Sequence, residues 1–369
     1  MTPKNESKIT SPKIRAPQIK LLEQLCNACA VSGDEGEVRA LVLEQVRPHA
    51  DEVKVDALGN VLVTRKGTAR GRKRLRVLLD AHMDEVGFML THDEGKGIFR
   101  FDTVGGLDIR QLVGKPVWVG RDHVPGVIGA KPIHLTTAKE RERSIPLDTL
   151  RIDIGPGGDP KIKVGDWATF ATSFTRLGPS MRGKALDDRL GVVLLIELLK
   201  HAPPNIDLLA AFTVQEEVGL RGARVAAYAF EPDIGIALDC TPALDLPIWE
   251  DDDHAPSENT SYNTRLGAGP AIYTADRATM SDPRLIRHLV ETAEELDIPY
   301  QFRQPGGGGT DAGAIQLAHT GVPSISVSVP GRYLHTAASI TRLSDWQHTI
   351  TLIYAALSRM TPKILAQDR

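Results

Sequence analysis

Two adjacent carboxylates close an apolar run of the sequence, in a position where a cation could bind. Glu216 and Glu217 follow the apolar segment 208–214, and two glycines, Gly219 and Gly222, come soon after them. Neighbouring carboxylates at the end of a buried strand repel each other and lose hydration, which is costly unless a cation compensates. This pair therefore indicates a metal site.

Four further candidate ligands follow apolar segments or open a helix, each in a different part of the chain: His82, Asp187, Asp239 and His335. Open α/β sheets bind ligands just outside the carboxyl ends of their strands, so residues far apart in the sequence can converge there. Imidazole and carboxylate donors without cysteine suit Zn²⁺ first, with Co²⁺ or Mn²⁺ as alternatives. With a ligand from the Glu216-Glu217 pair the set exceeds what one catalytic zinc needs, and it fits two metals that share a bridging carboxylate.

The same residues predict the chemistry. Two metals can hold a nucleophilic water and a substrate carbonyl together, but an acid that binds no metal must take the proton of the water. Within the Glu216-Glu217 pair, one residue can ligate while its neighbour points toward the water. Asp84 can accept the second ring proton of His82 and fix the tautomer of that histidine. We therefore predict a metal-dependent hydrolase.

Each motif alone has a simpler explanation. A His-x-Asp triplet is usually on the surface, a Glu-Glu pair is usually solvated, and Asp187-Asp188 could merely cap a helix. Their joint occurrence at strand ends and at a helix start favours the metal site. Cys26 and Cys29 form a C-x-x-C that could be a redox pair or half a zinc site. Their apolar-periodic segment favours packing of a buried helix instead.

Composition excludes several classes of protein. The 369 residues are 41% hydrophobic and 25% charged, with a net charge of −3, which argues against a broad basic face for nucleic acid. No apolar stretch approaches the roughly 18 residues that span a bilayer, and the N-terminus has no apolar signal segment. We expect residues 1–16 to form a disordered leader and the protein to be cytoplasmic. Three cysteines cannot build a disulfide framework.

The pattern of elements predicts an α/β fold of two parts. Strands and helices alternate over residues 17–87 and 178–369, which is typical of an α/β domain, and the continuous apolar strands indicate a sheet covered by helices on both faces. Residues 88–177 instead show short alternating segments separated by glycine and proline. We expect this part to be a small β-rich insertion, a barrel or a sandwich.

Six motifs, in this order, resemble those of metallopeptidase family 42, the dinuclear zinc aminopeptidases that include glutamyl and deblocking aminopeptidases and some members labelled as endoglucanases. The motifs are AHMDEVGF (81–88), GKALDDR (183–189), VQEEVGLRGA (214–223), ALD (237–239), GTDA (309–312) and PGRYLH (330–335). Segments 104–112 and 126–134 also resemble the second domain of that family. The likeness covers residues 17–360.

The resemblance implies a zinc-aminopeptidase-like catalytic domain with a mixed sheet and a PDZ-like insertion at 88–177 that is used in dimerisation. It places His82, Asp187 and Asp239 on one metal, and Asp187, Glu217 and His335 on the other, with Asp187 bridging. Glu216 becomes the general base and Asp84 the residue that orients His82. A cis peptide bond is implied between Asp187 and Asp188. The substrates implied are peptides with a free N-terminus, and the assembly is a homo-oligomer, from a dimer to a tetrahedral dodecamer.

Some features leave alternatives open. The chain departs from the family pattern at residues 336–340, where an acid is missing, which affects the surroundings of His335 or a subunit contact. The acidic stretch 249–254 could approach the amine of the substrate or be a solvated loop, and glycines 306–309 could offer backbone N–H groups or simply be flexible. A related carboxypeptidase, deacylase or glycosidase, or a metal-binding assembly protein without catalysis, is the alternative function. The preferred N-terminal residue and the physiological metal do not follow from the sequence.

Overall fold

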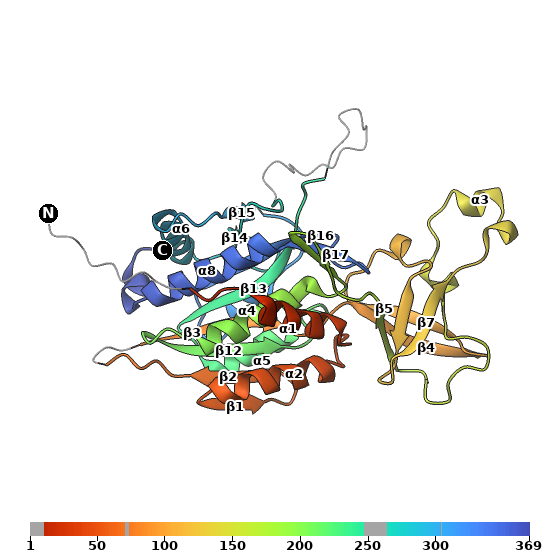
Figure 1. The fold of residues 1–369 in the computed structure, drawn as a ribbon, viewed down its shortest axis with the longest axis horizontal. Helices are drawn as coiled ribbons and strands as arrows, with labels where there is room; N and C mark the ends of the chain where they lie inside the picture. The colour runs from red at the N-terminus through yellow and green to blue at the C-terminus, as the bar shows by residue number, and fades with distance from the viewer. Residues whose placement is uncertain (1–10, 71–73, 247–263, 304) are drawn as a thin grey trace.

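The computed structural model describes residues 11–70, 74–246, 264–303 and 305–369. Figure 1 shows two parts, a large body of sheet and helices and a smaller lobe of strands at one end. The smaller lobe is formed by the middle of the chain, and the chain enters and leaves it from the large body.

The large body is built on a mixed sheet of eleven strands. Nine of them lie side by side in the order β1 (Glu52–Val55), β2 (Val61–Arg65), β12 (Ile206–Thr213), β3 (Leu75–His82), β13 (Ile234–Pro242), β16 (Ser324–Arg332), β17 (Ser339–Arg342), β11 (Ser180–Gly183) and β10 (Thr175–Leu177). β14 (Ala271–Tyr273) pairs with β16 and with β15 (Gln301–Arg303).

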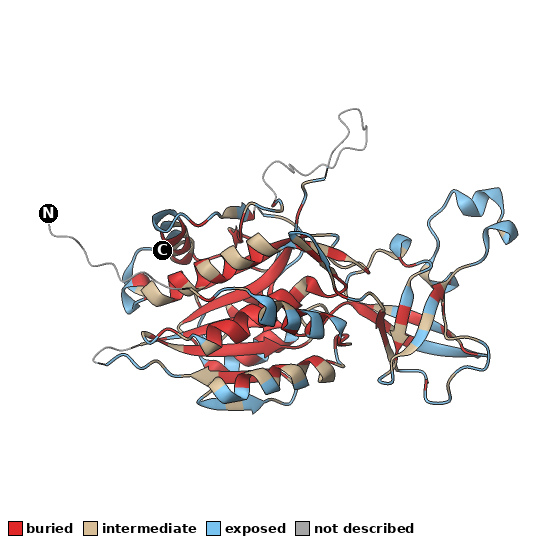
Figure 2. Ribbon diagram, viewed as in Figure 1, coloured by how far each residue is buried: buried red, intermediate tan, exposed pale blue. Residues whose placement is uncertain are grey.

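The four central strands, β12, β3, β13 and β16, are parallel. Thr213 of β12 lies opposite His82 of β3, and Ala237 of β13 lies opposite Asp80 of β3. The register therefore brings His82 and Asp239 to the same edge of the sheet. The apolar side chains of these four strands are buried, as Figure 2 shows for the centre of the sheet. A parallel sheet of this kind must be covered on both faces.

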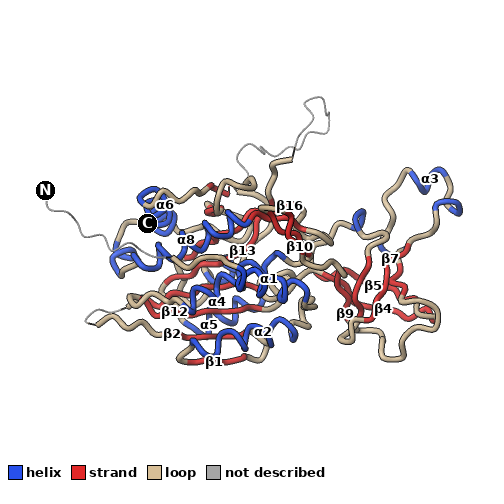
Figure 3. The backbone as a smooth tube through the Cα atoms, viewed as in Figure 1, coloured by secondary structure: helices blue, strands red, loops and turns tan. Residues whose placement is uncertain are grey.

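Helices cover both faces of the sheet (Figure 3). One face packs against α1 (Ala16–Asn27), α2 (Gly36–Val46), α4 (Leu186–Lys200), α6 (Pro283–Glu295) and α8 (Leu343–Arg359) in one large apolar core. The other face packs against α5 (Arg221–Phe230) and the short α7 (Asp311–Ile315) in a second core. α4 is apolar all round and buried along most of its length, because it lies between the sheet and the outer helices α1, α2 and α8.

The smaller lobe is a closed barrel with its own core. Its six strands follow the order β4 (Gly87–Gly95), β5 (Ile98–Val104), β8 (Arg151–Asp153), β7 (Val124–Gly129), β6 (Pro116–Val119) and β9 (Trp167–Phe170), and the short α3 (Ala138–Arg141) lies in a loop beside it. Phe88 stands at the centre of its core, with edge-to-face contacts to Phe101 and Phe170 at 5.2 Å between ring centroids.

The predicted fold class, an α/β domain with helices on both faces and a small β-rich insertion, is confirmed. The predicted disordered leader covers residues 1–10, which lie outside the described residues, and residues 11–16. Of the latter, Ile14 donates its N–H to Gln347 of α8 at 2.7 Å and Pro12 is buried. Residues 11–16 are therefore placed against α8 and not disordered, because α8 offers a polar partner to this segment. Within the described residues, no helix is both long and apolar enough to cross a bilayer.

Candidate metal centre

The carboxylate of Asp187 lies between two imidazoles at the edge of the central sheet. Its Oδ1 is 3.2 Å from Nε2 of His82, and its Oδ2 is 3.5 Å from Nε2 of His335. His82 ends β3, Asp187 stands in the first turn of α4, and His335 follows β16. Three remote parts of the chain therefore meet at one carboxylate, in the arrangement that a bridging ligand requires.

The other predicted ligands complete the cluster. Glu217 Oε2 is 3.2 Å from Nε2 of His335, and Asp239 Oδ1 is 3.8 Å from Nε2 of His82. Donor atoms of His82, Asp187 and Glu217 lie within 4.8 Å of one another. The sequence-predicted ligands therefore converge, one acid beside each histidine and one between them.

Asp188 adds a carboxylate that the sequence did not place among the ligands. One of its oxygens lies within 4.8 Å of donors on His82 and Asp239. Its Oδ1 also accepts the backbone N–H of Gly191 at 3.0 Å, which satisfies an amide in the first turn of α4. The peptide bond between Asp187 and Asp188 is cis, as the family resemblance implies.

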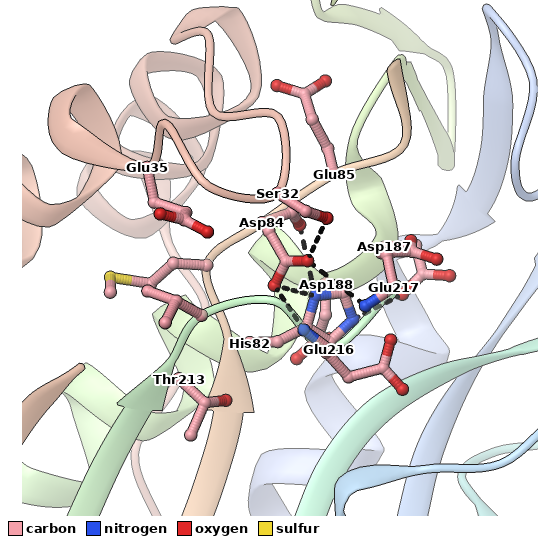
Figure 4. Close-up of polar contacts among 12 residues, drawn as sticks. Ser32, Glu35, His82, Asp84, Glu85, Asp187, Asp188, Thr213, Glu216 and Glu217 are labelled. Carbon is pink, nitrogen blue, oxygen red and sulfur yellow. Dashed lines mark hydrogen bonds and ion pairs between the residues drawn. The ribbon is translucent and has the colours of Figure 1, made fainter. Parts of the chain in front are cut away.

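Asp84 holds the segments of the cluster together (Figure 4). Its carboxylate accepts the backbone N–H of Glu216 at 3.0 Å and that of Glu217 at 3.2 Å, and it accepts the hydroxyl of Ser32 at 2.6 Å. Nδ1 of His82 lies 3.6 Å from the same carboxylate and 3.2 Å from the carbonyl oxygen of Asp84. Asp84 is thus placed to orient His82 and to fix the loop that carries the two glutamates.

Burial and crowding of like charges dominate the electrostatics of the cluster. Burial raises the pKa of Glu217 to about 7 and that of Asp239 well above its usual value. Burial opposes the charged form of Asp187 as well, but the two imidazoles outweigh it and lower the pKa of that carboxyl. The neighbouring carboxylates raise the pKa of His335 to about 9 despite its burial. The chemistry of this donor set fits divalent cations, which stabilise carboxylates that otherwise hold protons.

Glu216 differs from its neighbour. Among the described residues it belongs to none of the clusters whose donors lie within 4.8 Å of one another. Burial and the carboxylates of Asp239 and Asp311 raise its pKa well above the usual value. The side chain lines the same cavity as the candidate ligands, so it is an acid beside the cluster with a high affinity for a proton.

The cluster opens into a cavity of about 810 Å³ that is large enough for a peptide terminus. Gly307, Gly308 and Gly309 line it together with the candidate ligands. The glycine run is therefore part of the wall, and Gly308 accepts the backbone N–H of Arg277 at 3.0 Å. The acidic stretch 249–254 lies outside the described residues.

Sequence reasoning missed a buried pair of acids beneath the cluster. Asp80 and Asp311 are buried, and the hydroxyl of Thr213 contacts both, at 3.4 Å and 2.8 Å. Burial and the second carboxylate raise the pKa of Asp80 well above its usual value, so the two groups favour sharing a proton. The sequence signal for this pair was Asp80, an acid inside the apolar run of β3. Its partner Asp311 is remote in the sequence, so the pairing itself could not be recognised.

The departure from the family pattern at residues 336–340 lies where the two parts of the chain touch. Ala337 is buried against the apolar core of the barrel, and Thr336 donates its hydroxyl to the carbonyl oxygen of Tyr333 at 2.7 Å. Nδ1 of His335 lies 2.9 Å from the carbonyl oxygen of Gly106, in the segment that follows β5. The small residues here therefore permit close packing beside a candidate ligand.

Comparison with known proteins gives consistent matches over most of the chain. The model of the M42 glutamyl aminopeptidase family matches residues 59–352. A lysyl aminopeptidase of Pyrococcus furiosus is 32% identical over 93% of this chain and 97% of its own length, and a glutamyl aminopeptidase of Lactococcus lactis is 31% identical over 92% and 95%. Among solved structures, an aminopeptidase of Desulfurococcus kamchatkensis has a TM-score of 0.86 at 35% identity, covering 95% of this chain and 96% of its own. The TET1 peptidase of Pyrococcus horikoshii, which can assemble into a tetrahedron or a large octahedral shell, has a TM-score of 0.79 at 33% identity, covering 93% and 100%.

Proposed function

This chain belongs to the M42 glutamyl aminopeptidase family and is a peptide hydrolase, and we propose that it removes N-terminal residues from peptides with the help of two divalent ions. The ions would be held by five residues: His82, Asp187, Glu217, Asp239 and His335. Zn²⁺ suits this set of imidazoles and carboxylates, and Co²⁺ or Mn²⁺ could replace it.

The observation that carries this proposal is the position of Asp187. One of its oxygens faces His82 and the other faces His335, so a single carboxylate can serve two ions. Asp239 and Glu217 then stand at opposite ends, each beside one histidine. Two bound ions would supply a water of lowered pKa and polarise the carbonyl of the substrate.

Glu216 is the proposed general base. Its carboxylate would take a proton from the attacking water and pass it to the leaving amine, which needs an acid that is not itself a ligand. Its position supports this role, because it lines the same cavity as the candidate ligands and belongs to none of the described clusters of possible metal donors. Its backbone N–H is held by Asp84, so the loop that carries the base is fixed by the same residue that orients His82.

We also propose an organisation of the chain around this site. Residues 17–87 and 178–369 would form the catalytic part, and residues 88–177, which include the barrel, would mediate dimerisation. Self-association from a dimer up to a dodecamer is supported by the relatives of this fold, because the TET1 peptidase of P. horikoshii forms closed shells.

Hydrolysis of a panel of aminoacyl-p-nitroanilides tests the function. We expect release of p-nitroaniline from substrates with a free amine, loss of activity after treatment with a chelator, and recovery on addition of Zn²⁺ or Co²⁺. The N-acetylated substrates are the matched control and should not be cleaved. Activity that survives complete removal of metal would overturn the metal-dependent mechanism. Cleavage of N-acetylated substrates at equal rates would overturn the requirement for a free amine.

A further inference from the structure

A second group of metal-ligating side chains lies where the barrel meets the large body. Cys29 follows the end of α1, Glu37 stands in the first turn of α2, and His123 lies in the turn between β6 and β7. One donor atom from each of the three lies within 4.8 Å of the other two. None of these residues belongs to the centre at Asp187, and the sequence does not point to Glu37 or His123.

Direct contacts join the carboxylate of Glu37 to the imidazole of His123 and to the backbone of Cys29. Nε2 of His123 is 2.6 Å from Oε1 of Glu37, and the backbone N–H of Cys29 donates to Oε2 of the same carboxylate at 3.0 Å. The ring of His123 stacks on that of Trp118, with centroids 6.4 Å apart and planes 30° apart. Glu37 therefore faces both partners, and the imidazole is kept in one orientation.

Two members of the group, Cys29 and Glu37, line a cavity that can admit an ion and water. The cavity measures about 530 Å³, and Cys29, Glu37, Trp118 and Trp167 line it. The side chains of His123 and Glu37 are 37% and 40% exposed. An ion that reached them would keep access to solvent for a further ligand.

The two cysteines of the C-x-x-C motif, Cys26 and Cys29, lie in different environments. Cys26 is buried inside α1, where its thiol contacts the carbonyl oxygen of Ala185 at 3.8 Å, in agreement with its interpretation as a packing residue. Cys29 lies beyond the helix end and is only partly buried, so that interpretation is wrong for the second cysteine. Burial raises the pKa of the Cys29 thiol to about 12, which argues against a reactive thiolate in the absence of a cation.

We propose that Cys29, Glu37 and His123 bind one Zn²⁺ or Co²⁺ ion, separate from the ions at Asp187, with water as the fourth ligand. Thiolate, imidazole and carboxylate are donors that these ions accept in tetrahedral sites. On binding, the thiol releases its proton to solvent and the imidazole ligates in its neutral form. One thiolate and one carboxylate then balance the two charges of the ion.

The guanidinium groups that border the cavity have other partners. Arg121 pairs with Asp34 at 3.1 Å, and Arg39 donates to the carbonyl oxygen of Gly59 at 3.3 Å. These two contacts therefore direct both guanidinium groups to acceptors other than the carboxylate of Glu37. Because His123 belongs to the barrel and the other two ligands belong to the large body, the ion fastens the two parts to each other.

Metal content measured on the full-length protein tests this proposal. The wild type and its variants are stripped with a chelator, loaded with Co²⁺, separated from free ion, and analysed by mass spectrometry. The variants are Cys29→Ser and His123→Asn, since asparagine tolerates the left-handed backbone at position 123. We expect each to bind one ion per chain fewer than the wild type. Glu44→Gln, at an exposed position of the same helix as Glu37, should bind as many as the wild type.

The spectrum of the Co²⁺ protein gives an independent readout. A thiolate ligand produces a charge-transfer band in the near ultraviolet, which we expect in the wild type and not in Cys29→Ser. Cys240→Ala is the control, because Cys240 lies within 4.8 Å of Asp187 and Asp188; retention of the band in this variant assigns it to Cys29. Equal metal content in the wild type and Cys29→Ser, or a band that disappears only in Cys240→Ala, would overturn the proposal.

Discussion

The backbone N–H of Glu216 donates a hydrogen bond to the carboxylate of Asp84 at 3.0 Å. This contact joins the loop that follows His82, the last residue of β3, to the loop after β12, which carries the glutamate pair. Asp84 has no exposed surface. Burial opposes its ionisation, but His82, Ser32 and the amide of Glu216 lower its pKa, so the group remains a charged acceptor.

Asp84→Asn should weaken the metal centre without unfolding the chain. The amide cannot accept hydrogen bonds at both of its groups, so the orientation of His82 and of the glutamate loop is lost. We expect a loss of about 10- to 100-fold in metal affinity or turnover, as for partners of metal-binding histidines. Calorimetric titration with Zn²⁺ and assays on an aminoacyl-p-nitroanilide measure it. Ser32→Ala, which removes one donor to Asp84, should have a smaller effect. Unchanged metal affinity and turnover in Asp84→Asn would contradict the role of Asp84 in orienting His82.

Substitutions at the two adjacent glutamates should separate chemistry from metal binding. Glu216→Gln is expected to keep both ions and to lose on the order of 10²- to 10⁴-fold in kcat, the usual contribution of a general base. Glu217→Gln is its matched control and should lose metal, because this residue contacts His335 within the cluster. Metal analysis and kinetics on the same samples measure both effects. Retention of full turnover by Glu216→Gln would remove it from the role of base.

Metal affinity should fall as the pH falls. In the metal-free protein, His335 has a pKa of about 9 and Glu217 a pKa of about 7, so both hold protons below these values and must release them to ligate. One proton per ion changes affinity roughly tenfold per pH unit, and two change it roughly hundredfold. Between pH 9 and pH 7 we expect the metal affinity to fall at least about tenfold per pH unit, and below pH 7 to fall about hundredfold per pH unit. Competition with a chromophoric chelator measures the dependence, and a flat profile would contradict the assignment of these ligands.

The buried ion pair between Lys184 and Glu85 should be important for stability. Lys184 Nζ lies 2.5 Å from Glu85 Oε1, with both side chains almost fully buried, and Glu85 also accepts from Thr169 of the barrel. Lys184→Met removes the cation nearest to the buried Glu85 carboxylate and leaves Arg189 at 3.4 Å as a more distant partner. Because breaking a buried ion pair is costly, we expect a loss of about 3–5 kcal/mol. The exposed pair of Lys131 and Glu140 is the control, because Lys131→Met should have little effect on the free energy of unfolding. Denaturant unfolding of both variants measures the difference, and equal losses would contradict it.

Sequence patterns predicted the long elements of the fold and not the short ones. The helices α4, α6 and α8 and the strands β3, β12, β13 and β16 lie within residues 17–87 and 178–369, where alternating strands and helices are predicted. Continuous apolar runs and helical periodicity extend over many residues there. The strands β10, β11, β14, β15 and β17 are only three or four residues long. A segment of that length carries too little periodicity to be recognised, and its pairing partner decides its structure.

The convergence of the candidate ligands was predictable for a different reason. His82 and Asp239 lie toward the carboxyl ends of the neighbouring parallel strands β3 and β13, so the topology of the sheet alone brings them together. Asp80 and Cys29 were not predictable in this way. The raised pKa of Asp80 results in part from Asp311, which belongs to a remote segment. The donor cluster at Cys29 is formed with His123 of the barrel. Neither contact follows from a local sequence pattern.

The contact between His335 and Gly106 ties a candidate ligand to the chain that leaves β5. The ring that faces Asp187 and Glu217 is therefore seated partly by the large body and partly by the barrel. A tilt of the smaller lobe relative to the larger one would reach this imidazole first. In an assembly held together by the smaller lobe, as we propose, the subunit interface and the candidate metal centre would share this contact between His335 and Gly106.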